Sequence, residues 1–253
     1  MVLKSQIDKF NSLKKKTVLV TGTSRGIGKE ISLAFLNNGA KVIGLSSGKT
    51  KKIPIKNKKY NHIFCNLENN EEIKKIFLHL KKFKKIDVLV NNAGVTLEET
   101  KNINQNLDNF KKVIQTNLIS AYMLTSVLLK NKKKTKTIIN ISSIGGILGF
   151  PQNPSYQSSK AGIIGLTKSI ARDFGKKGLN CNAVLPGYFK TKMNKKSYNN
   201  YKKREQRSDL TILGRWGELK ELTATVMFLA SDSASYITGQ SIVVDGGISA
   251  KGL

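Results

Sequence analysis

The fold of this 253-residue chain is decided by residues 17–28, which read TVLVTGTSRGIG. The apolar run 17–20 predicts a buried strand, and residues 27–37 have the apolar spacing of a helix. A glycine turn between a strand and a helix lets the backbone approach a phosphate closely. It also directs the unpaired N–H groups of the helix N-terminus at the negative charge. A tight connection without a ligand is the alternative interpretation of this stretch alone.

On both sides of this turn, short β-branched or leucine-rich runs alternate with segments of helical apolar spacing. This alternation predicts right-handed βαβ units and a parallel sheet with helices on both faces. We therefore predict an α/β protein: a single-domain Rossmann fold over residues 1–253 with a seven-stranded, parallel, doubly wound sheet. The predicted strands are 17–20, 41–45, 62–64, 87–90, 137–141, 180–185 and 241–244, and the predicted helices are 27–37, 71–80, 107–129, 156–174 and 219–230.

Two stretches interrupt the alternation. Residues 46–60 are rich in lysine, contain Pro54 and have no apolar stripe, so the crossover helix expected there is short or absent. Residues 190–210 are polar and dotted with tyrosines, which predicts a mobile lid over the substrate within about residues 188–216.

Composition excludes several classes of function. The 44 basic and 16 acidic residues give a net charge of +28, but the lysines are scattered and form no arginine-rich stripe with aromatics. This predicts a solvated basic surface and no dedicated nucleic-acid site. Two distant cysteines and two histidines predict neither a disulfide framework nor a metal site. Residues 1–16 lack a secretory core, and no stretch has the roughly 18 apolar residues of a membrane span, so we expect a cytoplasmic protein.

The end of the second predicted strand is where a fold of this kind contacts the adenosine ribose. A carboxylate there would bind the ribose hydroxyls and repel a 2′-phosphate. This chain instead has Ser46 and Ser47, with Lys49 just beyond them and Arg25 in the glycine turn. Hydroxyls and cations without an acid favour NADP(H), while NAD(H) remains possible.

Tyr156 and Lys160 lie four residues apart in a predicted helix and so share one face of it. Such a pair is by itself most often a surface pair. Reduction of a ketone, however, needs a hydride and a proton, and a tyrosine with a pKa near ~10 donates its proton sluggishly. Lowering this pKa to about 7 takes roughly 4 kcal/mol, which a unit charge about 4 Å away supplies at an effective dielectric near 20. Lys160 is therefore predicted to lower the pKa of Tyr156.

Further motifs accompany these two: Asn91-Asn92-Ala93-Gly94 after the fourth predicted strand, Asn117 in the long predicted helix, Ser143 after the fifth strand and Pro186-Gly187 after the sixth. Together they resemble the classical short-chain dehydrogenase/reductase family over nearly the whole chain. The resemblance implies an NAD(P)-dependent oxidoreductase that transfers a hydride between a nicotinamide and a ketone or secondary alcohol, and that works as a homotetramer. It implies four catalytic residues: Ser143 holds the substrate oxygen, Asn117 orders a water that relays protons from Lys160, and Tyr156 is the proton donor. The cofactor-binding residues that it implies, beyond Tyr156 and Lys160, are Gly22, Thr23, Ser24, Arg25, Gly26, Ile27, Gly28, Ser46, Ser47, Asn66, Leu67, Asn92, Ala93, Gly94, Pro186, Gly187, Phe189 and Thr191.

The substrate stays open between two branches of that family. Residues 230–247 and 186–193 resemble the 3-oxoacyl-acyl-carrier-protein reductases, which implies a carrier-bound acyl substrate and a tentative place in fatty acid biosynthesis. Residues 214–217 and 154–156, and the N-terminal segment with Phe10 and Leu13, resemble sugar and gluconate dehydrogenases. Two further classes are less favoured: a non-catalytic nucleotide-binding module, which would commonly lack the tyrosine or lysine, and a nucleic-acid binder drawn by charge.

Overall fold

The computed structural model describes residues 11–48, 52–130 and 134–251. Seven parallel strands form one sheet in the order β3-β2-β1-β4-β5-β6-β7. The direction in which strands are added reverses between β1 and β4, so the predicted doubly wound Rossmann sheet is confirmed. The strands are β1 (Thr17–Thr21), β2 (Lys41–Ser46), β3 (Tyr60–Phe64), β4 (Val88–Asn91), β5 (Thr137–Ile141), β6 (Asn180–Pro186) and β7 (Ser241–Val244).

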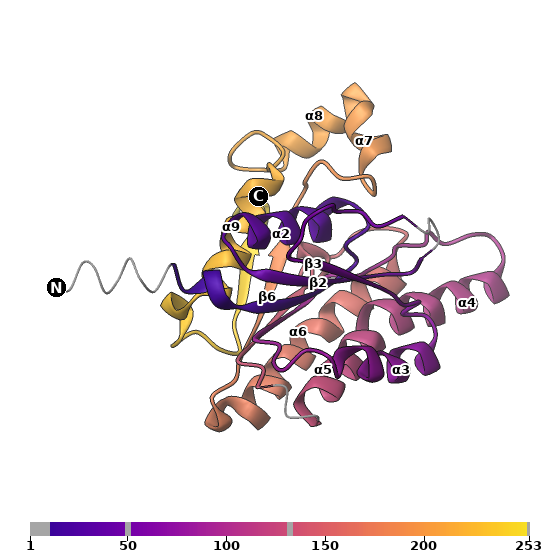
Figure 1. Cartoon of the computed structure of the whole chain (residues 1–253). Coiled ribbons are helices and arrows are strands. Elements are labelled where there is room, and N and C mark those ends of the chain that lie inside the picture. The colour runs from indigo at the N-terminus through magenta and orange to yellow at the C-terminus, as the bar shows by residue number, and fades with distance from the viewer. Residues whose placement is uncertain (1–10, 49–51, 131–133, 252–253) are drawn as a thin grey trace.

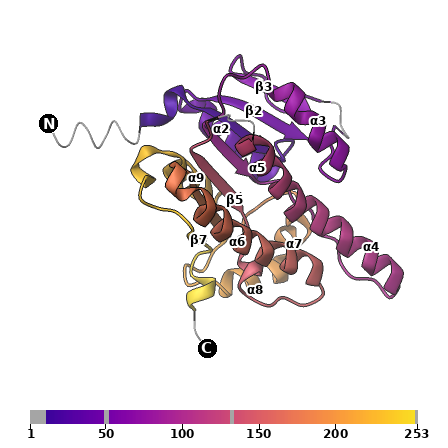
Figure 2. The same cartoon turned by 90° about the horizontal axis from the view of Figure 1, so that it is seen from below.

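Helices cover both faces of the sheet (Figures 1 and 2). On one face α2 (Gly26–Asn37) packs against α9 (Leu219–Ala230). The other face carries α3 (Asn70–Leu80), α4 (Ile103–Ile114), α5 (Ser120–Lys130) and α6 (Pro154–Phe174). Two short helices, α7 (Lys195–Asn199) and α8 (Tyr201–Asp209), lie together apart from the sheet, at the top of Figure 1.

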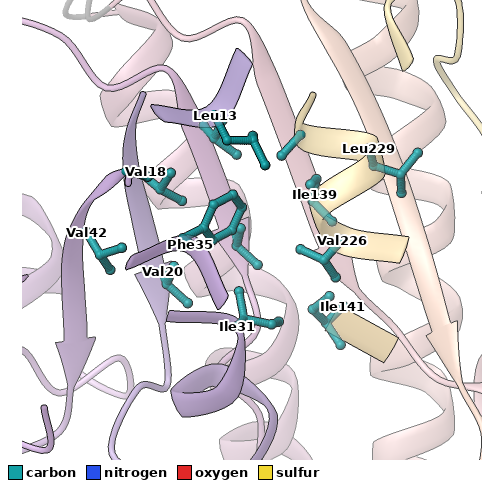
Figure 3. Close-up of a cluster of buried hydrophobic side chains, with 14 of the residues drawn as sticks. Leu13, Val18, Val20, Ile31, Phe35, Val42, Ile139, Ile141, Val226 and Leu229 are labelled. Carbon is teal, nitrogen blue, oxygen red and sulfur yellow. The ribbon is translucent and has the colours of Figure 1, made fainter. Parts of the chain in front are cut away.

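Alternation along each strand builds a separate core on each face of the sheet. Val18 and Val20 of β1 point toward α2 and α9, whereas Leu19 joins the core under α3 and α5. Figure 3 shows the first of these cores, in which Phe35 of α2 lies fully buried between strand and helix side chains. Because both faces are covered, the inner strands read as continuous apolar runs rather than as alternating ones.

The structure differs from the expected elements in two places. The predicted helix 107–129 is two α-helices joined by a π-helical turn, Gln115–Ile119, and the predicted lid contains α7 and α8. The very polar sequence of α8 gives no apolar stripe, although Asn200 caps the helix by accepting a hydrogen bond from the Lys203 N–H. As predicted, the described part of the connection between β2 and β3 contains no helix. No helix in the described ranges is long and apolar enough to cross a membrane.

Candidate active site

A cavity of about 630 Å³ opens at the carboxyl ends of the strands, on both sides of the β1–β4 switch point. This is the place where doubly wound folds bind their ligands, and the volume is that of a cofactor site. Its lining joins the glycine turn, the ends of β2 to β6, the N-terminal part of α6 and the start of the lid. From the predicted set it includes Gly22, Ser24, Arg25, Gly26, Ile27, Gly28, Ser46, Ser47, Asn66, Leu67, Asn92, Ala93, Gly94, Ser143, Tyr156, Lys160, Pro186, Gly187, Phe189 and Thr191.

The glycine turn is held tightly against the turn that follows β4. The Thr21 hydroxyl accepts hydrogen bonds from the Asn92 and Ala93 N–H groups, each at 2.9 Å, and Asn92 Nδ2 donates to the Thr21 carbonyl. A Cβ on Gly28 would overlap Asn92 Nδ2 and the Gly22 carbonyl, so this packing requires glycine. Gly22 also has a φ of +73°, which L side chains rarely adopt.

The start of α2 fits a phosphate group. Arg25, at the N-cap, makes no side-chain hydrogen bond to the first turn of the helix, and no acidic residue lies in that turn. The first N–H groups therefore keep their donor capacity beside the cavity, where a helix N-terminus favours negative charge. Deeper in the same cavity, the Thr116 hydroxyl is buried without a partner in the described structure, as expected of a group that serves a ligand. The lining thus fits a dinucleotide.

The ends of β2 and β3 form one extremity of the cavity. Ser46 and Ser47 line it there, together with Asn66 and Leu67 after β3. The described lining also contains one carboxylate, Glu68, which was not predicted and which forms an ion pair with Lys112 at 3.4 Å. Lys49, part of the NADP(H) prediction, lies outside the described residues, as does Phe10.

The other extremity holds the predicted catalytic side chains. Ser143 follows β5, and Tyr156 and Lys160 project from the first turns of α6. Lys160 is only 3% exposed, donates a hydrogen bond to the Ile141 carbonyl at 2.8 Å, and lies 5.5 Å from the centroid of the Tyr156 ring. Ser142 fixes α6 against β5 by donating to the Lys160 carbonyl at 2.7 Å. Sheet and helix thus bring the three groups together.

Burial shifts the pKa of two of these groups. It raises the pKa of Tyr156 above its ordinary value, and the interaction with the Ser143 hydroxyl offsets only part of this rise. Burial also lowers the pKa of Lys160 to about 8. The prediction that Lys160 lowers the pKa of Tyr156 is therefore wrong for this structure. Removal from water disfavours the phenolate and the ammonium alike, and it is the largest cause of both shifts.

Asn117 lies in the π-helical turn and is 2% exposed, behind the cavity rather than in its lining. Its side chain accepts from the Val95 N–H at 2.8 Å and donates to the Val95 carbonyl at 2.9 Å and to Ser159 Oγ at 3.0 Å. A π-turn inserted in a helix often marks a functional position. Here the π-turn orients the Asn117 side-chain amide, and the amide connects the segment after β4 to α6.

Two predicted positions therefore differ from the rest of the set. Thr23 is fully buried and, like Asn117, is absent from the lining, because its hydroxyl lies against the Tyr60 hydroxyl at 2.9 Å instead. Sequence reasoning also missed part of the lining. Some of the missed residues directly follow a recognised motif and could have been found by extending it, whereas the others are brought into the lining by the fold and carry no local signal. The complete set of missed lining residues is Gly48, Cys65, Glu68, Val95, Thr96, Thr116, Ile141, Ser142, Lys192, Met193 and Asn194.

Comparison with known proteins agrees with this geometry. A family model described as enoyl-(acyl carrier protein) reductase matches residues 22–249. The chain is 41% identical to the 3-oxoacyl-(acyl-carrier-protein) reductase of Rickettsia typhi, over 92% of this chain and 96% of that protein. Among solved structures it is similar to the aldohexose dehydrogenase of Thermoplasma acidophilum, with 33% identity, a TM-score of 0.85 and coverage of 96% and 97%. It is also similar to a 4-hydroxyisoleucine dehydrogenase complexed with NADH, with 30% identity, a TM-score of 0.87 and coverage of 94% and 100%.

The fold and the cavity are those of a dinucleotide-binding protein of the Rossmann type. The chain belongs to the short-chain dehydrogenase/reductase family, as its sequence motifs predicted. It is thus an enzyme that acts on CH–OH groups or the corresponding carbonyls with a nicotinamide cofactor.

Proposed function

We propose that this enzyme reduces the 3-oxo group of carrier-bound acyl thioesters with NADPH. The observation that carries the proposal is the 41% identity to a 3-oxoacyl-(acyl-carrier-protein) reductase along nearly the full length of both chains. Preference for the 2′-phosphorylated cofactor is supported by Arg25, Ser46 and Ser47 in the lining and by the position of Glu68, which follows β3 rather than β2. The net charge of +28 would attract an acidic carrier protein.

We assign the proton transfer to Tyr156. A bound nicotinamide supplies the hydride, and the phenol gives its proton to the oxygen that becomes the alcohol. A raised pKa keeps Tyr156 protonated at neutral pH, which is the form needed for reduction. Lys160, with a pKa of about 8, is protonated at neutral pH and can return a proton to the phenolate within the same pocket. Ser143, beside the phenol, donates a hydrogen bond to the substrate oxygen.

We assign two tasks to Asn117. It fixes Val95 and Ser159, and thereby the distance between the segment after β4 and α6. A Cβ on Gly94 would lie 3.4 Å from both Asn117 Oδ1 and Lys160 Nζ, so these two atoms border the same space. A water held there would accept from Lys160 and donate to Asn117, so that Asn117 would hold in place the water through which, as the family resemblance implies, protons pass from Lys160 to solvent.

We further propose that the enzyme works as a homotetramer. Several apolar side chains are exposed on α4 and α5, among them Ile103 at 81% and Tyr122 at 56%. Val243 is 37% exposed on β7, an edge strand that pairs with β6 on one side and with no described strand on the other. Exposed apolar groups on the outer helices and at the sheet edge support association between copies.

The competing function is oxidation of a sugar or sugar acid. The similarity to an aldohexose dehydrogenase favours it, as do residues 214–217 at the base of the lid. A substrate panel decides: oxidation of NADPH and NADH is followed with an acetoacetyl thioester, and reduction of NADP⁺ and NAD⁺ with aldohexoses and gluconate. We expect kcat/KM with the thioester and NADPH to exceed every other pair by at least about tenfold. Higher values with a sugar would overturn the proposal.

A further inference from the structure

A chain of side-chain hydrogen bonds runs from the glycine turn to the end of β2. Thr23 Oγ1 lies 2.9 Å from the Tyr60 hydroxyl, which lies 2.9 Å from Nδ1 of His62. Nε2 of the same ring lies 3.0 Å from Ser46 Oγ. Gly44 makes room for this chain, because a Cβ there would overlap the Tyr60 hydroxyl. Ser46 lines the cavity whereas His62 does not, so Ser46 is where the chain meets a ligand.

We infer the direction of these hydrogen bonds from the carbonyl acceptor at the far end. The Thr23 hydroxyl donates to the Leu45 carbonyl at 3.3 Å, which leaves its lone pairs for the Tyr60 hydroxyl. Tyr60 then accepts from Nδ1–H of a neutral His62. A neutral imidazole has one donor and one acceptor nitrogen, so Nε2 accepts the proton of Ser46. With its proton used in this way, Ser46 presents only lone pairs to the cavity.

Protonation of His62 reverses the last of these hydrogen bonds. An imidazolium donates from both nitrogens, so Nε2–H donates to Ser46 Oγ and the Ser46 proton becomes free to point into the cavity. A ribose 2′-hydroxyl can donate to a lone pair of Ser46, but a 2′-phosphate dianion can only accept. The two forms of His62 therefore suit two different ribose groups.

We propose that His62 is a positioning residue that sets cofactor preference through Ser46: the protonated ring favours a 2′-phosphorylated cofactor and the neutral ring a free ribose hydroxyl. The proposal rests on the proposed placement of the adenosine ribose at the end of β2. Binding of the phosphorylated cofactor is then coupled to proton uptake at His62, and the preference for it weakens as the pH rises.

The surroundings of the ring allow this titration. Tyr60 and Phe64 flank it on β3, with ring centroids at 5.8 and 4.7 Å, and β2 carries no ionisable side chain between Lys41 and its end. The charged groups at the cavity mouth are Arg25 of the glycine turn and Glu68. Helix α2, on the same face of the sheet, carries Lys29 and Glu30. The described connection before β3 carries four lysines: Lys52, Lys56, Lys58 and Lys59.

Burial lowers the pKa of His62. The ring is therefore neutral at neutral pH without a ligand, and a dianion bound at Ser46 would raise its pKa.

Binding of two adenosine nucleotides tests the proposal without catalysis. Adenosine 2′,5′-bisphosphate and 5′-AMP are titrated into the full-length protein at pH 6.5 and 8.5 by calorimetry. We expect the ratio of their affinities, bisphosphate over 5′-AMP, to be about tenfold larger at pH 6.5, the effect of one charge-assisted hydrogen bond. The 2′-phosphate, with a pKa near ~6, loses its own proton over this range and would shift the ratio the opposite way.

Three variants isolate the residue. In His62→Phe, and in Ser46→Ala, the ratio should become flat or rise with pH, whereas His79→Phe, which removes the exposed histidine of α3, should behave as wild type. His62→Gln serves if the phenylalanine variant fails to fold. A wild-type ratio independent of pH, or a ratio that falls as steeply in the His62 variants, would overturn the proposal. If Ser46→Ala leaves both affinities unchanged, the placement of the ribose is wrong and the proposal for His62 fails, whereas the reductase function is tested independently by the substrate panel.

Nuclear magnetic resonance of the ring nitrogens provides a second readout. The chain has only two histidines, so His79→Phe leaves the signals of His62 alone. We expect the neutral ring to carry its proton on Nδ1, and its pKa to rise on addition of adenosine 2′,5′-bisphosphate but not of 5′-AMP. A neutral ring protonated on Nε2, or equal pKa values with both nucleotides, would contradict the proposed direction of the hydrogen bonds.

Discussion

The catalytic end of the cavity and the lid hold their side chains in different ways. At the catalytic end, Lys160 and Asn117 are almost fully buried and hydrogen-bonded to backbone groups of neighbouring segments. In the lid, Trp216 packs against Tyr188 and Tyr198, and Arg207 lies 4.8 Å from the Tyr188 ring centroid. Hydrogen bonds require narrow ranges of distance and angle, whereas ring and cation contacts tolerate a wider range of geometries. We infer that the first region sets the reaction and the second the substrate.

The largest effect should come from Tyr156→Phe. Loss of the hydroxyl removes the proton donor while the ring keeps its place, so we expect kcat/KM with the preferred substrate to fall about 10²- to 10⁴-fold. The dissociation constant of the cofactor, measured by fluorescence titration, should change less than about threefold. Tyr236→Phe makes the same change at a fully exposed residue and should leave turnover intact. Undiminished turnover in Tyr156→Phe would remove the basis for the catalytic assignment.

Lys160 should make stability depend on pH. The pKa of Lys160 is about 8 in the folded protein and near ~10.4 in the unfolded chain, so the unfolded state binds more protons between these values. The contribution of Lys160 to stability therefore rises with pH over that window, by about 3 kcal/mol in total. Cys65 and Cys181, whose pKa burial raises to about 12, act in the opposite direction at high pH in every variant. In urea unfolding from pH 7 to 10.5, wild type should therefore show this rise in its free energy of unfolding relative to Lys160→Met. Lys168→Met, an exposed position of α6, should retain it; a rise equally present in Lys160→Met would exclude Lys160 as its origin.

The smallest effect should come from Arg207→Gln in α8. The change removes a cation that lies over the rings of Tyr188 and Trp216, a contact that contributes about 1 kcal/mol. We expect KM for the acyl thioester to rise roughly threefold to tenfold, with kcat and cofactor affinity unchanged. Arg172→Gln, on the exposed side of α6, is the control. A fall in kcat at constant KM would mean that the lid, too, sets the reaction.

Local sequence was sufficient for the sheet and for most of the cavity. Strand β5, for example, begins and ends where its run of β-branched residues predicts, because a strand covered on both faces must be largely apolar. The helix with Tyr156 and Lys160 was recognisable from the helical spacing of its apolar residues. In contrast, the π-turn at Asn117 and the helices of the lid were missed. The π-turn depends on contacts of Asn117 with Val95 and Ser159, and the helices of the lid lack an apolar stripe.

The sequence by itself determined the glycine turn and the doubly wound order of the elements, and it predicted the candidate catalytic side chains, because each follows from local spacing. Only the tertiary structure decided the electrostatics. The spacing of Tyr156 and Lys160 suggested that the lysine lowers the tyrosine's pKa, but burial raises it instead. Likewise, no local sequence pattern predicts the chain of hydrogen bonds that links Thr23 and Tyr60 to His62 and Ser46. This chain forms because β2 and β3 pair in parallel. Burial and strand register are properties of the whole fold, which a local motif does not contain.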